Sequence, residues 1–201
     1  MSTGNWIRLP DVPEARYAPA TIVVDNHIHL FACAKTDRTT PAHDYWILDL
    51  NHLTRGWINA STLPFSGDHG RASLINGWIY FYSFEHGHSS LETTHTGVWD
   101  RNKKIVCPGS YIAQPQVMKI HSKHTVDSSQ WTYLVDMPQP VSRATSLVLN
   151  NRWIMVIGGI SHEIDQYARN IQLFDTITNR WRLLSPLPEY GKFPLAWMEK
   201  D

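Results

Sequence analysis

Cysteine is scarce in this chain: only Cys33 and Cys107 occur in the whole sequence, and no Cys-x-x-Cys spacing is present. Two isolated cysteines do not make a disulfide framework, so a reducing compartment is favoured. Charge of one sign is also missing, because 18 Lys and Arg residues balance 18 Asp and Glu residues. A neutral chain lacks the basic surface that binds nucleic acids or anionic membranes. We therefore expect neither a nucleic acid nor a membrane as a partner.

Segments that would direct the chain into a membrane or out of the cell are not evident. No apolar run approaches the length of about 18 residues that a membrane span needs. Residues 1–5 have neither the basic region nor the apolar core of a signal peptide. The sequence also has no Gly-x-Ser-x-Gly, P-loop or His-Glu-x-x-His motif. These absences predict a cytoplasmic protein with no catalytic residues and no cofactor.

Aromatic residues are abundant instead, with nine Trp and eight Tyr, and such residues favour β-strands. Three apolar runs are each interrupted by a turn dipeptide of the kind that closes β-hairpins. The dipeptides are Asp25-Asn26, Asn76-Gly77 and Asn150-Asn151, so the steps from one to the next are 51 and 74. This spacing indicates that one structural unit occurs three times.

A second pattern, a Trp followed shortly by a Pro, repeats with steps of 51, 74 and 50. Its four members are Trp6 with Pro10, Trp57 with Pro64, Trp131 with Pro138, and Trp181 with Pro188. Two unrelated patterns rarely agree in this way by chance. Self-similarity at a period of about 50 residues is typical of repeat proteins, most often β-propellers.

The third unit shows the complete pattern of one propeller blade. Strands are predicted at Leu147–Leu149 and Trp153–Ile157, on either side of the Asn-Asn turn, and then at Asn170–Asp175 and Trp181–Leu184. Four antiparallel strands within about 50 residues correspond to one blade.

The pair Gly158-Gly159, together with Phe174 and Trp181, resembles the kelch repeat, in which a Gly pair precedes an aromatic residue and a Trp about seven positions later. The first unit has Ala32-Cys33 in place of the Gly pair, and the second has Tyr82-Ser83. The resemblance extends over roughly residues 5–190. It implies an all-β fold, a partial kelch-type β-propeller of about three four-stranded antiparallel blades, as in kelch-like and galactose-oxidase-type proteins.

We assign the three units to residues 11–63, 64–137 and 138–188, with residues 189–201 as the start of a further strand. The second unit is longer than the others, because its repeat step is 74 where the step of the third is 50. Its residues 97–107 are interpreted as an inserted hairpin. The alternative is that they are the remnant of a separate, degenerate blade.

Three blades do not close a ring, because closed propellers typically have four to eight. Residues 5–9 are predicted as a leading strand and residues 193–198 as a strand in the tail. The arc would leave apolar blade faces uncovered at its ends. We therefore expect a fragment of a longer ring, a pair of copies or an open arc, with self-association through the open blade edges.

Arginines precede the first predicted strand of each unit: Arg16, Arg71 and Arg143. The kelch resemblance implies that arginines at this point of a blade line the mouth of the central channel and bind acidic peptides. Guanidinium groups suit this role because they bind carboxylates through two parallel hydrogen bonds. The alternative is that these arginines pair with acidic residues of neighbouring loops or lie in water.

Histidine is frequent, with eleven residues, and three of them, His86, His88 and His95, fall in one polar loop of the second unit. This spacing is compatible with a metal site. It is equally typical of a Gly, Ser, Thr and His-rich loop without a ligand, so no metal is predicted and the three remain weak candidates.

The sequence therefore favours a non-catalytic protein–protein interaction module that binds a protein partner by its propeller loops, with an acidic segment as the candidate ligand. The resemblance implies a link to substrate adaptors of ubiquitin ligases, of which this chain would be a fragment. The alternative is an enzyme on a kelch propeller, either a copper oxidase or a sugar-processing protein.

Overall fold

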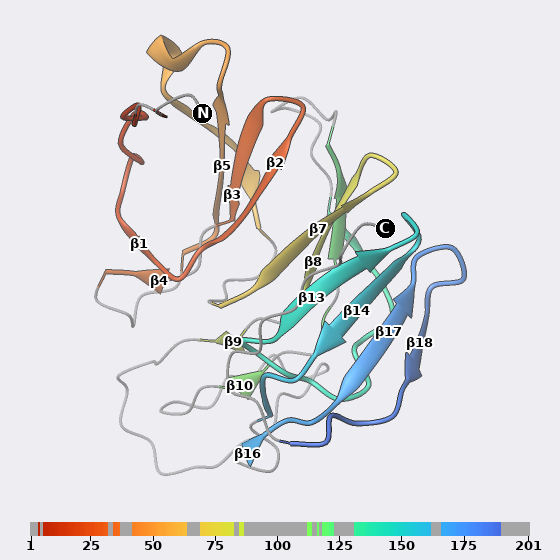
Figure 1. The fold of residues 1–201 in the computed structure, drawn as a ribbon. Helices are drawn as coiled ribbons and strands as arrows, with labels where there is room; N and C mark the ends of the chain where they lie inside the picture. The colour runs from red at the N-terminus through yellow and green to blue at the C-terminus, as the bar shows by residue number, and fades with distance from the viewer. Residues whose placement is uncertain are drawn as a thin grey trace.

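A computed structural model of the chain contains three four-stranded antiparallel sheets, which confirms the all-β class and the partial propeller predicted from the sequence (Figure 1). The structure describes residues 4, 6–31, 34–36, 42–63, 69–82, 85–86, 112–113, 116, 118–122, 131–161 and 166–189. We call the three sheets blades 1, 2 and 3 in chain order.

Each blade orders its strands as they occur in the chain, from the inside of the arc outward. Blade 1 consists of β2 (Ala20–Val24), β3 (His27–Phe31), β5 (Asp44–Asp49) and β6 (Trp57–Thr62), with a short 3-10 turn at Leu53–Arg55. Blade 2 consists of β7 (Arg71–Ile75), β8 (Trp78–Tyr82), β11 (Met118–His121) and β12 (Thr132–Tyr133). Blade 3 consists of β13 (Thr145–Leu149), β14 (Trp153–Ile157), β17 (Ile171–Asp175) and β18 (Arg180–Leu183).

Three two-stranded ribbons extend the blades at the end where the first strands begin. They pair β1 (Arg16–Tyr17) with β4 (Ala34–Lys35), β9 (Glu85–His86) with β10 (Ile112–Ala113), and β15 (Ile160–Ser161) with β16 (Gln166–Tyr167). The first strands β2, β7 and β13 contact one another in sequence and run in the same direction (Figure 1). The blades are therefore arranged side by side around the inner strands, as in a propeller.

The turn chemistry explains why the hairpins form where the sequence predicts them. Asp25, Asn26, Asn76, Asn150 and Asn151 all have positive φ, between 46° and 60°. Asn and Asp tolerate this left-handed conformation, which tight hairpin turns require. The predicted first hairpin of each unit is thus present in all three blades.

The predicted leading strand over residues 5–9 is not formed: residues 6–9 are not part of any sheet. Trp6 and Ile7 are exposed at 101% and 76%. A strand needs a hydrogen-bonded neighbour, and no described strand pairs with this segment. The predicted tail strand at residues 193–198 and the hairpin at residues 97–107 lie outside the described residues. The unit boundaries also stay a prediction.

The core consists of two clusters, one between each pair of neighbouring blades. Between blades 1 and 2, Phe31 stacks on Tyr45 with ring centroids 4.8 Å apart, and both Phe81 and Trp131 lie 5.7 Å from Phe31. Between blades 2 and 3, Phe174 is the central aromatic residue. Apolar blade faces that pack against each other thus hold the arc together.

Two of the repeated Trp residues tie a fourth strand to the segment that leads into the same blade. The Trp57 Nε1 donates to the Pro10 carbonyl at 3.0 Å, and the Trp181 Nε1 donates to the Val135 carbonyl at 3.3 Å. Trp181 also packs on Phe174, with centroids 5.0 Å apart. Trp131 lies instead in the cluster between blades 1 and 2. All three residues therefore make structural contacts.

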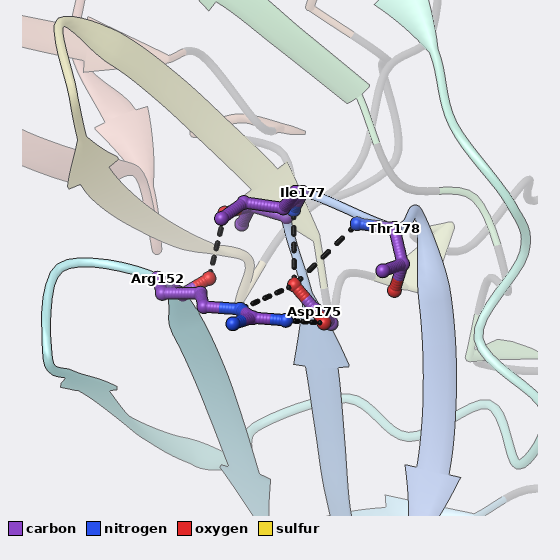
Figure 2. A network of polar contacts seen from close by, with 5 residues as sticks. Arg152, Asp175, Ile177 and Thr178 are labelled. Carbon is purple, nitrogen blue, oxygen red and sulfur yellow. Dashed lines mark hydrogen bonds and ion pairs between the residues drawn. The ribbon is translucent and has the colours of Figure 1, made fainter.

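An aspartate at the end of the third strand organises the following turn (Figure 2). Asp175 accepts hydrogen bonds from the Arg152 side chain at 2.6 and 3.0 Å and from the Ile177 amide at 3.0 Å. The Arg152 guanidinium holds the pKa of Asp175 well below its usual value. Asp49 has the equivalent place in blade 1, where it accepts from the Asn51 amide at 2.8 Å. The motif is structural in both blades.

Steric crowding explains why glycine is needed at Gly159 in blade 3, so Gly159→Ala tests the blade geometry. Gly159 has φ +101°, and a Cβ there would lie 2.5 Å from the Ser142 carbonyl oxygen. We expect this substitution to lower the unfolding free energy by about 1–3 kcal/mol, the cost of a strained backbone residue. Denaturant titration measures the effect. The control is Gly56→Ala, since Gly56 has φ +67° with no atom within 4 Å of an added Cβ. A smaller loss of unfolding free energy for Gly159→Ala than for Gly56→Ala would contradict this geometry.

Candidate functional site

One end of the arc carries all three predicted site arginines. We call the end where β2, β7 and β13 begin the front rim (Figure 1). Two residues before each of these strands lies a residue with positive φ: Ala18 at 49°, His69 at 57° and Arg143 at 54°. The steps between these left-handed residues, 51 and then 74, equal those between the hairpin turns, so they mark equivalent positions of the repeat.

The three arginines are therefore not structurally equivalent. Arg16 lies two residues before its left-handed residue, Arg71 two residues after, and Arg143 is the left-handed residue itself. Side chains displaced by two residues along a strand share a face but lie about two residue rises apart. The structure thus places all three at the front rim but in three different settings.

Arg16 is paired within the protein. Its side chain is only 3% exposed and makes ion pairs with Glu14, at 2.8 Å, and with Asp44. The guanidinium also lies over the Trp46 ring, 4.6 Å from its centroid. With Lys35, Arg16 lowers the pKa of Glu14. The charge of Arg16 is thus already compensated by Glu14 and Asp44. This agrees with the alternative given in the sequence analysis, in which the arginine pairs with acidic residues of the protein itself.

Arg71 is different because its charge has no acidic partner among the described residues. It is the first residue of β7 and lies opposite Tyr82 in the hairpin. Its one hydrogen bond there is from Nη1 to the adjacent Gly70 carbonyl, at 3.2 Å. Burial lowers the pKa of Arg71, because desolvation disfavours the charged form, and the nearby Tyr82 hydroxyl opposes this only weakly. A partly buried cation without a counterion favours the binding of an anion.

The surroundings of Arg71 are rigid. The Tyr82 hydroxyl is fully buried and hydrogen-bonded to the Ser73 hydroxyl at 2.6 Å. Burial raises the pKa of Tyr82, so this hydroxyl stays protonated. The Ser146 hydroxyl of blade 3 also bonds Tyr82, which links the two blades below Arg71. A guanidinium held on such a base can bind a carboxylate with little reorganisation.

Arg143 lies beside this position, at the same end of the neighbouring inner strand. Its chain neighbours Ser142 and Ala144 are both 0% exposed. The Ser142 amide donates to the Ile160 carbonyl at 3.0 Å, and the Ile160 amide donates back at 2.8 Å. Buried neighbours and two backbone hydrogen bonds therefore hold the backbone beside the partly exposed Arg143 side chain in place.

The other candidates from the sequence are described only in part. The His86 backbone lies in β9, whereas His88, His95, Cys33 and Cys107 lie outside the described residues. Within the part of the chain that the structure describes, no group of three His, Cys, Asp or Glu residues could hold a metal ion. The expectation of no metal and the weak candidacy of His86, His88 and His95 are therefore not tested by the described residues.

A hollow that the sequence did not reveal lies at the opposite end of the arc, between the hairpin turns of blades 1 and 2. Its volume is about 380 Å³. The lining residues are Val24, Asp25, Leu74, Asn76, Gly77, His121 and Ser122. The Asn76 side chain is occupied, because it exchanges hydrogen bonds with Asn151 of the neighbouring turn. This hollow separates two turns and is not continuous with the arginines.

The three stacked four-stranded blades define the chain as a partial β-propeller. Comparison with known proteins specifies the type. The chain is 22% identical, over 203 aligned positions, to a kelch repeat-containing protein of Arabidopsis thaliana. The alignment covers 96% of this chain and 45% of that protein. No protein-family model matches the chain.

The solved structure of YjhT, a kelch-type propeller, matches the fold with a TM-score of 0.66 and 14% sequence identity. The match covers 91% of this chain and 55% of YjhT. The chain is thus a kelch-type propeller in fold, and it spans about half the length of both proteins. No helix among the described residues is long and apolar enough to cross a membrane.

Proposed function

We propose that this chain is a non-catalytic interaction module that binds an acidic segment of a protein partner at the front rim. The kelch-type fold supports the general class. The observation that carries the specific proposal is Arg71, a partly buried guanidinium without an acidic partner in the described structure. Arg143 lies at the same end of the neighbouring strand β13, and the charge of Arg16 is compensated by Glu14 and Asp44.

The guanidinium group of Arg71 favours partners that carry carboxylates. A guanidinium donates two parallel hydrogen bonds to a carboxylate, and this geometry favours Glu or Asp side chains. The interaction is stronger where water is partly excluded, as it is around Arg71. A flexible acidic segment could reach between the loops, which a folded surface could not do as easily. An adaptor role in ubiquitin ligation and a cytoplasmic location are further proposals that rest on the kelch resemblance and on the two isolated cysteines.

Arg71→Ala should weaken the binding of acidic peptides without destabilising the fold. We expect the dissociation constant to rise roughly 10- to 100-fold, because a hydrogen bond to a charged group contributes about 1.5–3 kcal/mol. The thermal stability should stay the same or increase, since the variant removes an uncompensated partly buried charge. An array of peptides with paired glutamates, followed by calorimetric titration of the best one, measures this effect.

Arg182→Ala is the matched control, because Arg182 is an exposed arginine on β18 of blade 3. It should bind the selected peptide as the unmodified chain does. Arg143→Ala should show an intermediate loss of affinity. If Arg71→Ala and Arg182→Ala bind with equal affinity, or if Arg71→Ala unfolds, Arg71 is a structural residue and the proposed site is wrong.

A further inference from the structure

The hairpin turns of neighbouring blades meet in two different ways at the end of the arc opposite the front rim (Figure 1). Between blades 2 and 3 the turns are tied together, because the Asn76 Nδ2 donates to the Asn151 carbonyl at 3.3 Å and the Asn151 Nδ2 donates to the Asn76 Oδ1. Between blades 1 and 2 no side-chain hydrogen bond joins the two turns among the described residues, and the hollow of about 380 Å³ lies there instead. Small-molecule sites have volumes of roughly 300–1,000 Å³, so this hollow has room for one small ligand or one long side chain of a partner.

The blade 2 side of the hollow is held in place by its own contacts. The Ser122 amide donates to the Gly77 carbonyl at 2.8 Å, and the His121 ring packs edge-on against Trp78 with ring centroids 4.9 Å apart. A Cβ at Gly77 would lie 3.4 Å from the His121 Nε2 and 4.0 Å from the Ser122 hydroxyl, so the glycine keeps the space beside these two groups open. A wall that is already ordered lowers the cost of binding a ligand.

The charge of the hollow is negative at one point. Among the described residues that line it, Asp25 is the one with a carboxylate, and no Lys or Arg is present. Asp25 is an exposed residue of the blade 1 turn, and its carboxylate makes no hydrogen bond or ion pair within the described parts of the chain. Other turn aspartates are used internally, since Asp49 is hydrogen-bonded to His52 at 2.7 Å and Asp175 to Arg152 at 2.6 Å. Asp25 is therefore a carboxylate that a ligand can use.

The remaining lining determines which kind of cation fits. Val24 and Leu74 of the inner strands supply apolar surface, and the Ser122 hydroxyl supplies a second hydrogen-bond acceptor beside the Asp25 carboxylate. An ammonium group on a methylene stem matches both, because the stem covers apolar surface while the charged head keeps polar partners. An anion would meet the Asp25 carboxylate, and an apolar ligand would desolvate that carboxylate without compensation.

We propose that the hollow binds an ammonium group on a short aliphatic stem, with the Asp25 carboxylate as its counterion. The lysine side chain of a partner protein and a free alkylamine share this chemistry. The site is separate from the front rim, because it lies at the other end of the arc and carries a carboxylate where the front rim carries Arg71.

Amide NMR titration of the full chain tests the proposal, because it detects weak binding residue by residue. The cationic probes are N-acetyl-lysine amide and butylamine. N-acetyl-norleucine amide is the control probe, since it keeps the aliphatic stem and lacks the charge. We expect both cationic probes to produce saturable shifts at Asn26, Gly77 and Ser122, and the norleucine probe to bind more weakly. Tighter binding of the lysine probe supports a partner's side chain as the ligand, and tighter binding of butylamine supports a free amine.

Asp25→Asn is the informative variant, because Asn76 and Asn150 hold the same turn position in blades 2 and 3, with φ between 46° and 49° at all three residues. The turn should therefore stay intact. The dissociation constant of the cationic probes should rise roughly fivefold, the upper range for an ion pair that water can reach. Asp11→Asn is the matched control, since it removes an exposed carboxylate outside the hollow and should bind as the unmodified chain does.

Three results would overturn the proposal. They are equal affinity for the lysine and norleucine probes, equal affinity of Asp25→Asn and the unmodified chain for the cationic probes, and shifts that do not saturate or lie only outside the hollow. Arg71→Ala should bind the cationic probes unchanged, so failure of this site is distinguishable from failure of the front-rim site.

Discussion

Replacing Phe31 with Ala is expected to lower the unfolding free energy by about 3–5 kcal/mol, the range for truncation of a large aromatic residue in a core. Phe31 is 0% exposed, and its ring centroid lies 4.8 Å from that of Tyr45 and 5.7 Å from those of Phe81 and Trp131. These rings come from both blade 1 and blade 2, so the substitution leaves a cavity at the blade contact. The substitution should therefore weaken the packing between blades 1 and 2, and not the sheet of blade 1 alone.

Urea titration monitored by Trp fluorescence measures this loss, at one fixed protein concentration because self-association would add to the apparent stability. The control is Ile177→Ala, at a 70% exposed position, which should change stability by less than about 0.5 kcal/mol. A loss below about 1 kcal/mol for Phe31→Ala, far under the range for core truncations, would mean that blades 1 and 2 do not pack through this cluster.

Stability should also fall as the pH decreases from about 6.5 to 4, because of the buried His29. Burial, with a smaller contribution from the nearby His27 and opposition from Asp25, lowers the pKa of His29 from 6.5 to about 4. The folded protein therefore keeps His29 neutral where the unfolded chain binds a proton. The contribution is complete above pH 6.5 and is lost as the pH falls toward 4, by roughly 3 kcal/mol.

His29→Asn is the informative variant, since an amide does not titrate and can still form a hydrogen bond with the Tyr45 hydroxyl, as His29 does. Its unfolding free energy should be flatter between pH 6.5 and 4 than that of the unmodified chain. Asp175 should not mask this difference. Its pKa is lowered in the folded protein, so most of its contribution to stability is lost only at more acidic pH. Parallel pH profiles for the two proteins would show that His29 is not buried in the neutral form.

The hairpins and blades were predictable because their signals are local. Asn150-Asn151 and Asn76-Gly77 adopt the positive φ that their residue types allow, and the strands follow directly on either side. The Gly158-Gly159 pair was recognisable for the same reason, since a Cβ at Gly159 would collide with the backbone of Ser142. Local backbone chemistry thus sufficed to identify the repeat.

The setting of each arginine was not predictable, because it depends on residues far apart in the sequence. Arg16 is neutralised by Asp44, 28 residues later, and covered by Trp46. The left-handed residue that aligns the three units is Ala18, His69 or Arg143, and these residue types share no recognisable pattern. The place of each arginine before its first strand therefore did not reveal that the three positions are not equivalent. The strand predicted at residues 5–9 failed for a related reason: a strand depends on a hydrogen-bonded neighbour, and no described strand pairs with residues 6–9.

One titration tests most directly whether the front rim is a binding surface: the affinity for a single acidic peptide, measured at low and at high salt, for the unmodified chain and for Arg71→Ala. We expect the unmodified chain to bind more tightly and to lose affinity as salt is added, because exposed charges are screened within about 10 Å at 0.1 M. The Arg71→Ala variant should bind roughly 10- to 100-fold more weakly and depend less on salt. Equal affinities and equal salt dependence for the two proteins would contradict the proposed function.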